Sequence, residues 1–205
     1  MTATAQGTDG QPRCQWSNGA PEFPHYHDTE WGFPVGDDRG LFEKVCLEGF
    51  QSGLSWRTIL VKRENFRAAF DNFDFNKVAN YTQADVERLL QNAGIVRHRG
   101  KIEAVINNAK RAQELVQSEG SIAAFFWRYE PTPEQLGEPQ SMTTSEQSIA
   151  LAKALKKLGW KFVGPTTAFA LMQAMGLVND HVHGCIIRDQ VEQARKEFKR
   201  PVRTS

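Results

Sequence analysis

Apolar residues recur at helical spacing along most of this chain, and this pattern constrains its fold more than any other feature. The clearest case is residues 101–116, where an apolar stripe occupies one helical face. Shorter stripes of the same period cover residues 41–46, 58–70, 86–93, 150–158 and 166–175. No segment alternates convincingly with the period of two that a half-buried strand requires, and no internal repeat is present. The predicted class is all-α.

Capping residues indicate where these helices begin and end. Asp37 or Asp38 can cap the first helix, and Thr82 with Asp85 has the spacing of a capping box. The other predicted boundaries are Gly94 after residues 86–93, Gly120 after residues 101–116, Ser121 before a short aromatic helix, a capping box from Thr144 to Gln147, and Pro165 with Gly176 around the last apolar helix. Residues 131–143 contain three prolines and are predicted to be an exposed loop.

The chain is long and apolar enough for a packed core. It has 205 residues, of which 40% are hydrophobic, and this suits one large domain or two small lobes. Its 25 Lys and Arg residues against 24 Asp and Glu residues give a net charge of +1, so any nucleic-acid contact must come from local patches. No apolar run approaches the roughly 20 residues that span a bilayer, so we expect no membrane association.

Three segments are expected. Residues 1–12 are small and polar and lack the pattern of a signal peptide, so we expect a disordered tail and a cytoplasmic protein. Residues 13–190 are predicted to form the folded domain. Residues 191–205 are predicted to be a charged helix or tail, with the helix near residues 190–200.

The spacing of two cysteines and two histidines points to a metal site. Twelve residues lie between Cys14 and His27, and three lie between His181 and Cys185. Two Cys and two His are a donor set that favours tetrahedral zinc, and four protein ligands without an open position would make that zinc structural. The alternative is that each residue is a lone surface histidine or a buried thiol. A metal bound by all four would join the two ends of the folded domain.

Apart from the histidine at position 98, which belongs to a basic turn described below, Cys46, His25 and His183 need another explanation. In a reducing compartment the cysteines are not expected to form disulfides. Cys46 lies on an apolar helical stripe and is most simply a small core residue. His25 and His183 are left over, and His183 lies between two candidate ligands and could compete with them for the metal.

Glu48 is a single carboxylate between apolar helical turns, in the stretch 47–56 that also contains two glycines and Trp56. It could face solvent at a frayed helix end, because glutamate is rarely fully buried. It could instead be buried with a partner. Three tryptophans and a tyrosine share the first 56 positions with it: Trp16, Tyr26, Trp31 and Trp56. They could be core residues, or they could form with Glu48 a pocket for a flat cationic heterocycle.

Two basic turns connect predicted helices. One is residues 94–101, which contain two arginines, a histidine and a lysine. The other is residues 159–167, a glycine-containing hairpin that leads into the start of a helix, with four lysines at or near it: Lys153, Lys156, Lys157 and Lys161. Backbone N–H groups at such a helix start suit a phosphate. The alternative is an ordinary corner between two helices with a solvated lysine face.

Several segments together closely resemble the 3-methyladenine DNA glycosylase I family. They occur in the same order without large gaps and span about residues 13–185. The segments are Cys14–Trp16, Tyr26–Gly32, Leu41–Glu43, Cys46–Gly49, Gly53–Trp56, Lys62–Asn65, Gly94–Ile102, Lys161–Gly164 and Gly176–His181. The resemblance implies a helix-hairpin-helix DNA glycosylase fold with two helical lobes, and hydrolytic release of 3-methyladenine from alkylated double-stranded DNA. It makes residues 13–190 a DNA glycosylase domain.

The resemblance also implies roles for individual residues. One structural zinc would be bound by Cys14, His27, His181 and Cys185. The base pocket would be formed by Glu48 as the catalytic carboxylate, with Tyr26 and Trp56 as base-binding residues and Trp16 and Trp31 as further walls. DNA would be contacted by Gln51, Gly53 and Leu54, in the loop that fills the gap left by the flipped base, and by Lys161, Gly164 and Thr166 in the hairpin.

The expected reaction is base flipping followed by hydrolysis. No lysine stands where a Schiff-base nucleophile is expected, so we predict a monofunctional, monomeric enzyme without lyase activity. Relatives in the wider superfamily use an aspartate after the hairpin helix, and Asp180 is near that position, but it adjoins a proposed zinc ligand and ranks below Glu48. Two other interpretations are a non-enzymatic DNA-binding module and a zinc hydrolase with an open metal site.

Overall fold

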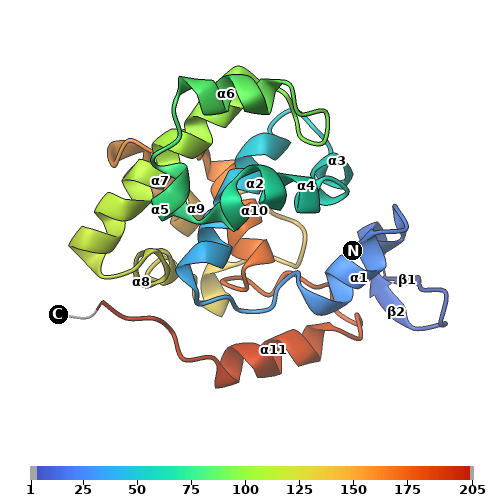
Figure 1. Cartoon of the computed structure of the whole chain (residues 1–205). Coiled ribbons are helices and arrows are strands. Elements are labelled where there is room, and N and C mark those ends of the chain that lie inside the picture. Colours follow the sequence, from blue (N-terminus) through green and yellow to red (C-terminus); the bar gives the residue numbers. More distant parts are fainter. Residues whose placement is uncertain (1–3, 204–205) are drawn as a thin grey trace.

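The computed structural model describes residues 4–203, and this part of the chain is predominantly helical, as the sequence predicts (Figure 1). The α-helices are α1 Phe23–Thr29, α2 Asp38–Gln51, α3 Trp56–Leu60, α4 Arg63–Ala69, α5 Phe75–Val78, α6 Gln83–Leu90, α7 Arg99–Glu119, α8 Ile122–Trp127, α9 Glu146–Lys157, α10 Pro165–Ala174 and α11 Arg188–Glu197. Short 3-10 helices cover Gln15–Asn18, Asp71–Phe73 and Pro133–Gln135, and two short strands are β1 Thr4–Gln6 and β2 Pro12–Cys14.

The two strands correct the expectation for the N-terminal segment. Residues 4–12, expected to be disordered, belong to an antiparallel hairpin in which Thr4 lies opposite Cys14. The hairpin is held to the rest of the protein by the Ile186 N–H, which donates to the Pro12 carbonyl over 3.0 Å. Strands of three residues are too short to produce a visible alternation, which explains why the pattern missed them. Residues 1–3 of the expected tail lie outside the described part of the chain.

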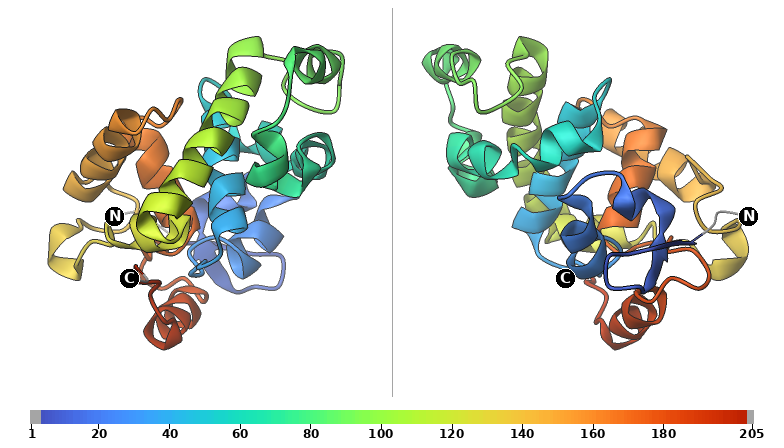
Figure 2. Two further views of the ribbon diagram at one scale, coloured as in Figure 1. Left: turned by 60° about the vertical axis from the view of Figure 1, so that its left-hand side comes forward. Right: turned by 90° about the vertical axis from the view of Figure 1, so that its right-hand side faces the viewer.

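Helix α2 lies in the middle of the fold. It packs against α7, α8 and α10, which surround it in the views of Figures 1 and 2. Its large apolar side chains have 3% of their surface exposed or less: Leu41, Phe42, Val45, Cys46, Leu47 and Phe50. A helix covered on nearly all sides is normally apolar all round. The two charged residues buried in α2, Lys44 and Glu48, are therefore exceptional.

Buried apolar residues form two clusters. The larger contains α2 and the helices around it. The smaller brings residues 14–31 together with residues 174–191, and its members are Cys14, Tyr26, Trp31, Ala174, Val182, Cys185, Ile187 and Val191. The blue N-terminal and red C-terminal segments accordingly lie side by side in the right-hand view of Figure 2. Trp56 and Met175 pack against both clusters, so the boundary between the clusters passes beside α3.

Most helix ends follow their predicted caps. The Asp37 side chain accepts a hydrogen bond from the Gly40 N–H, and Thr82 with Asp85 forms a complete capping box. One cap prediction is wrong: Ser145, not Thr144, caps the start of α9, because Ser145 and Ser148 exchange side-chain and backbone hydrogen bonds.

Two other predicted boundaries also differ from the structure. The single helix predicted over residues 58–70 is divided into α3 and α4, with a break at Val61–Lys62. Helix α6 ends at Leu90 and not at Gly94, because the Asn92 side chain accepts the Gly94 N–H in a turn.

The charged helix predicted near residues 190–200 is α11. Arg195, near its end, donates to Glu130 over 2.8 Å, and Arg200 just beyond the helix does the same. These ion pairs hold α11 against the loop after α8. No helix within residues 4–203 has the length and hydropathy needed to cross a bilayer.

Candidate active site and metal centre

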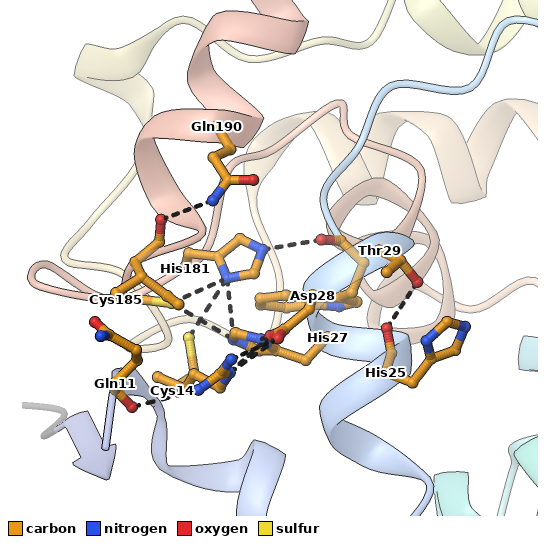
Figure 3. Close-up of polar contacts among 12 residues, drawn as sticks. Gln11, Cys14, His25, His27, Asp28, Thr29, His181, Cys185 and Gln190 are labelled. Atoms are coloured by element: carbon orange, nitrogen blue, oxygen red, sulfur yellow. Dashed lines mark hydrogen bonds and ion pairs between the residues drawn. The ribbon is translucent and has the colours of Figure 1, made fainter. Parts of the chain in front are cut away.

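Cys14, His27, His181 and Cys185 come together in the smaller apolar cluster. All four are buried, and their nearest ligand atoms lie within 4.8 Å of one another. Figure 3 shows the side chains pointing toward a common centre from the end of β2, from α1 and from the segment before α11. This cluster could hold a metal ion.

The distances within the cluster agree with tetrahedral zinc coordination. Typical zinc bonds of about 2.3 Å to sulfur and about 2.05 Å to nitrogen give tetrahedron edges of about 3.6 Å between S and N and about 3.3 Å between two N atoms. Here His27 Nε2 lies 3.2 Å from His181 Nδ1, and Cys185 Sγ lies 3.6 Å from each of these nitrogens. Cys14 Sγ also lies 3.6 Å from His181 Nδ1. The four donor atoms are therefore already spaced as ligands of one ion.

The second nitrogen of each histidine has a partner of the kind that orients metal ligands. His27 Nδ1 lies 2.7 Å from Asp28 Oδ1, and His181 Nε2 lies 2.9 Å from the Trp31 carbonyl oxygen. Such contacts leave Nε2 of His27 and Nδ1 of His181 free to coordinate. Asp28 is held in turn by Arg13.

The sulfur atoms are also prepared for coordination. The Val182 N–H donates to Cys14 Sγ over 3.4 Å. A hydrogen bond from the Cys14 thiol, and contacts with His181 and His27, lower the pKa of Cys185. Cys185 is therefore favoured as the thiolate, the form of cysteine that binds metals, whereas the hydrogen bond with Cys185 and burial raise the pKa of Cys14.

The remaining Cys and His residues lie outside this cluster. The His183 side chain is 68% exposed and lies 3.6 Å from Glu138, so it does not compete for the centre. His25 is also exposed. Cys46 is buried in the larger cluster, as predicted for a small core residue, and burial raises the pKa of its thiol well above its usual value.

A pocket of about 410 Å³ opens at the boundary between the two apolar clusters. It contains every residue predicted to surround a base: Trp16, Tyr26, Trp31, Glu48 and Trp56. Gln51, predicted to contact DNA, lies on its wall as well. The sequence did not single out the other lining residues, which are Phe23, Ser55, Arg57, Ala170 and Gln173.

The aromatic rings form two walls of the pocket. Trp16 and Trp31 meet edge to face with centroids 5.1 Å apart, and Tyr26 and Trp56 are tilted with centroids 5.4 Å apart. The buried Trp56 Nε1 has no hydrogen-bond partner among the described residues. A flat ring entering the pocket would therefore find aromatic side chains on two sides.

Glu48 is buried, contrary to the possibility of a frayed helix end, and its partner is a residue that the sequence interpretation missed. Lys44 Nζ lies 3.0 Å from Glu48 Oε1 and donates to the Tyr26 hydroxyl oxygen over 2.8 Å. The spacing of four residues in one helix was the available signal. Burial is the largest single effect and lowers the pKa of Lys44, but the combined interactions with Glu48 and Tyr26 outweigh it, so the pKa of Lys44 is raised.

This arrangement fixes which groups the pocket offers. An ammonium group can only donate, so the Tyr26 oxygen acts as the acceptor toward Lys44, and its own O–H proton remains available to another acceptor. Burial raises the pKa of Tyr26, so this proton is retained near neutral pH. Glu48 uses one oxygen for Lys44 and keeps the other for a donor. The pocket thus offers a phenolic donor and a carboxylate acceptor to a flat polar ring.

The loop after α2 is exposed, and the Lys101 side chain holds its start by hydrogen bonds. Gly53 has φ of +78°, a left-handed conformation that favours glycine, and Leu54 beside it is 40% exposed. Lys101 Nζ donates to the carbonyl oxygens of Phe50 and Ser52 over 2.8 and 2.6 Å. Lys101 belongs to the first basic turn, so its ammonium group serves the end of α2, and no phosphate contact is needed to explain it.

The second basic turn joins α9 to α10, which pack against each other. Lys161 and Thr166 are exposed, and Gly164, just before α10, has open space where a side chain would be. Asn108 holds the turn by bonding both the N–H and the carbonyl of Lys161. The turn approaches α2 closely at Gly49, where an added Cβ would lie 3.3 Å from Phe162 Cβ. Ala170 and Gln173, in the C-terminal half of α10, line the pocket.

Asp180 is engaged structurally. It is 7% exposed, and it accepts hydrogen bonds from the Gln140 N–H and from the Gln173 side chain over 2.9 and 2.6 Å. Burial raises its pKa. It does not line the pocket that contains Glu48.

Comparison with known proteins gives a consistent result. A family model described as methyladenine glycosylase matches residues 16–189. DNA-3-methyladenine glycosylase 1 of Escherichia coli K12 is 50% identical over 177 residues, which cover 84% of this chain and 95% of that protein. The corresponding figures for DNA-3-methyladenine glycosylase of Haemophilus influenzae are 45% over 177 residues, with 84% and 96% covered. A solved structure of 3-methyladenine recognition by the Staphylococcus aureus enzyme has 37% identity and a TM-score of 0.81, and 86% and 96% of the two chains are covered.

Proposed function

Because the chain belongs to the methyladenine glycosylase family, we propose that it is a DNA repair enzyme that excises 3-methyladenine from alkylated DNA. One observation supports this assignment above the others. The pocket of about 410 Å³ gathers Glu48 and five aromatic residues, a set suited to a flat, electron-poor heterocycle. A DNA-binding module without enzymatic activity would have no use for a carboxylate buried in such a pocket.

The substrate base must leave the duplex before it can enter the pocket. Methylation at N3 gives the base in DNA a positive charge, which favours stacking on tryptophan and tyrosine faces. The free oxygen of Glu48 accepts from the exocyclic amine, and the Tyr26 hydroxyl donates to a ring nitrogen. A normal adenine has no methyl group at N3 and no positive charge to weaken its bond to the sugar, so it is a far poorer leaving group.

Hydrolysis then needs little further help, because the methylated base is a good leaving group. Water attacks C1′ of the sugar while the bond from C1′ to N9 breaks. The electron pair of that bond stays with the base and neutralises it, and the proton of the water passes to solvent. Glu48 acts by binding the base in the orientation required for bond breaking.

We also propose that the enzyme is monofunctional. A lyase step requires an amine that can attack C1′. Lys44 is the buried lysine nearest the pocket, but its donors are directed to Glu48 and Tyr26, and it does not line the pocket. An intact sugar–phosphate strand after base release is the expected product.

Double-stranded DNA would be held by two exposed elements. Gln51, Gly53 and Leu54 would enter the duplex at the position left by the flipped base. The hairpin with Lys161, Gly164 and Thr166 would bind phosphates through the lysine and the N–H groups at the start of α10. A monomer suffices, since pocket, loop and hairpin belong to one chain.

The metal in the four-residue cluster would be one structural zinc. Its ligands would be Cys14, His27, His181 and Cys185, which leave no coordination position for substrate. The ion would hold the N-terminal and C-terminal segments together behind the Trp31 wall. A cytoplasmic location agrees with an enzyme that acts on DNA.

The direct test is release of free base. The protein is incubated with duplex DNA treated with a methylating agent, and the soluble fraction is separated by chromatography. We expect 3-methyladenine with no strand cleavage. Binding to DNA without any base release would support the non-enzymatic alternative, and loss of activity within seconds of adding a chelator to folded protein would support a zinc hydrolase.

A further inference from the structure

Lys44 is more deeply buried than its contribution to packing requires. Its side chain is 6% exposed, in a helix that is covered on nearly all sides. Methionine would fill a similar space without the cost of removing a charge from water. The ammonium group is therefore the feature that needs an explanation, and its surroundings lie next to the base pocket.

Trp56 separates Lys44 from the pocket. Lys44 Nζ lies 3.5 Å from the centroid of the Trp56 ring. Lys44 lines a second cavity of about 220 Å³, whereas Glu48 lines the base pocket, and Trp56 lines both. A base stacked on the pocket side of the ring at about 3.5 Å would be about 7 Å from Nζ.

A positive charge at that distance opposes a cationic base. Two unit charges about 7 Å apart, at an effective dielectric constant of about 20, repel by an energy equal to roughly a fiftyfold change in binding. Glu48 attracts the same cation, but it is paired with Lys44 at 3.0 Å. The wall of the pocket is consequently close to electroneutral.

Electroneutrality matters because the base loses its charge during the reaction. An unpaired carboxylate would stabilise the cationic base before the bond breaks more than the neutral base afterwards, and this would slow the chemical step. Given the proposed excision of 3-methyladenine, on which this inference rests, we propose that Lys44 is a positioning residue with an electrostatic role. It holds Glu48 and Tyr26 in place, and its charge weakens binding of the cationic base relative to the neutral one, so that bond breaking is favoured.

The test separates charge from packing. Lys44→Met removes the charge, and Lys44→Arg keeps it. Single-turnover excision from methylated duplex DNA gives a maximal rate constant and a half-saturating concentration. For Lys44→Met we expect the maximal rate constant and the half-saturating concentration both to fall about tenfold, which is the pattern of lost ground-state destabilisation. For Lys44→Arg, which keeps the charge, we expect neither quantity to fall. A half-saturating concentration that rises while the rate constant is unchanged indicates simple damage to binding and overturns the proposal.

Small-molecule binding gives an independent measurement. The probes are neutral 3-methyladenine and its permanently cationic 3,9-dimethyl derivative. The ratio of their affinities should shift about tenfold toward the cation in Lys44→Met, and an unchanged ratio overturns the proposal. If Lys44→Met does not fold, Lys44→Gln takes its place, because its amide keeps two donors without the charge.

The unmodified protein provides the last control. It should bind the neutral base at least as tightly as the cation, and a tenfold preference for the cation contradicts the inference without any variant. If the unmodified protein releases no 3-methyladenine, the proposed function fails. If it releases the base and Lys44→Met behaves identically, only the inference about Lys44 fails.

Discussion

His27 Nε2 lies 3.2 Å from His181 Nδ1, although 154 positions separate the two residues. With Cys14 and Cys185 they join the beginning and the end of the folded chain. Two imidazoles at this distance, with their other nitrogens already bonded, need either a shared proton or a metal between them. The spacing between S and N atoms in the cluster favours the metal.

The first prediction therefore concerns metal content and stability. Elemental analysis should find one zinc per chain, and its removal by a chelator under mildly denaturing conditions should lower the melting temperature sharply. A structural zinc contributes on the order of 10 kcal/mol to the folding free energy of small zinc domains. We expect only a part of that amount here, because the larger apolar cluster stays folded without the metal. His181→Ala should behave like the metal-free protein. His183→Ala is the matched control, and a control variant that also loses zinc would contradict the assignment.

The second prediction concerns Glu48. Glu48→Gln keeps the size of the side chain but loses the charged acceptor for the base. Hydrogen bonds to charged groups contribute about 1.5–3 kcal/mol, so base excision should fall by roughly tenfold to a hundredfold, with binding to undamaged DNA unchanged. Asp180→Asn is the comparison, because Asp180 is buried outside the pocket. Excision by Glu48→Gln at the parent rate would exclude the proposed role.

The metal cluster illustrates what a sequence can predict. The donor types and the short spacing from His181 to Cys185 suggested a site, and each of the four residues predicted as ligands lies in it. The all-α class followed from helical periodicity for the same reason: both signals depend on neighbours in the chain. The pocket was predicted by resemblance, because spacing alone did not show that Trp16 and Trp56 share a cavity.

Lys44 illustrates what the sequence could not show. A lysine four residues before a glutamate usually marks a solvated helix face. Only the positions of α7, α8 and α10 reveal that this part of α2 is covered. The hairpin β1–β2 was missed because strands of three residues show no visible alternation. The contacts that hold it come from Asn18, after the strands, and from the distant Ile186, and neither leaves a signal in the sequence of the hairpin.

The third prediction concerns the exposed loop after α2. Leu54→Ala removes an apolar side chain that is 40% exposed and that we expect to fill the gap in the duplex. Excision from duplex DNA should fall at least several-fold, whereas binding of free 3-methyladenine should not change, because Leu54 does not line the pocket. Val61→Ala, at a residue that is 51% exposed, is the matched control. Equal effects of the two variants would indicate a general loss of stability.

The fourth prediction concerns the hairpin between α9 and α10. Lys161→Ala should weaken binding to any duplex sequence, and the slope of log K against log salt concentration should fall by about one for the lost phosphate contact. Lys196→Ala, on the exposed side of α11, is the control of equal charge and should leave the slope unchanged. Titration of fluorescent DNA at several salt concentrations measures both. An unaltered slope for Lys161→Ala would place the phosphate contacts elsewhere.

The fifth prediction concerns pH and the attachment of α11. Burial alone raises the pKa of Glu130, but hydrogen bonds from Arg200 and Arg195 outweigh it, and the pKa lies below its usual value of 4.5. A carboxyl group with a lowered pKa in the folded state stabilises that state above its unfolded pKa. This contribution is therefore complete above about pH 5 and is lost as the pH falls through the lower, folded value.

Glu130→Gln removes this contribution. Urea unfolding at pH 7 should show a loss of about 1–3 kcal/mol, because a partly buried charged acceptor for two arginines is gone. Parent and variant should converge as the pH falls below 4, where the parent carboxyl group also becomes neutral. Glu138→Gln is the control, since the Glu138 side chain is 81% exposed and its removal should matter little at either pH. A constant difference between parent and Glu130→Gln from pH 7 to below pH 4 would mean that packing, and not charge, holds α11 in place.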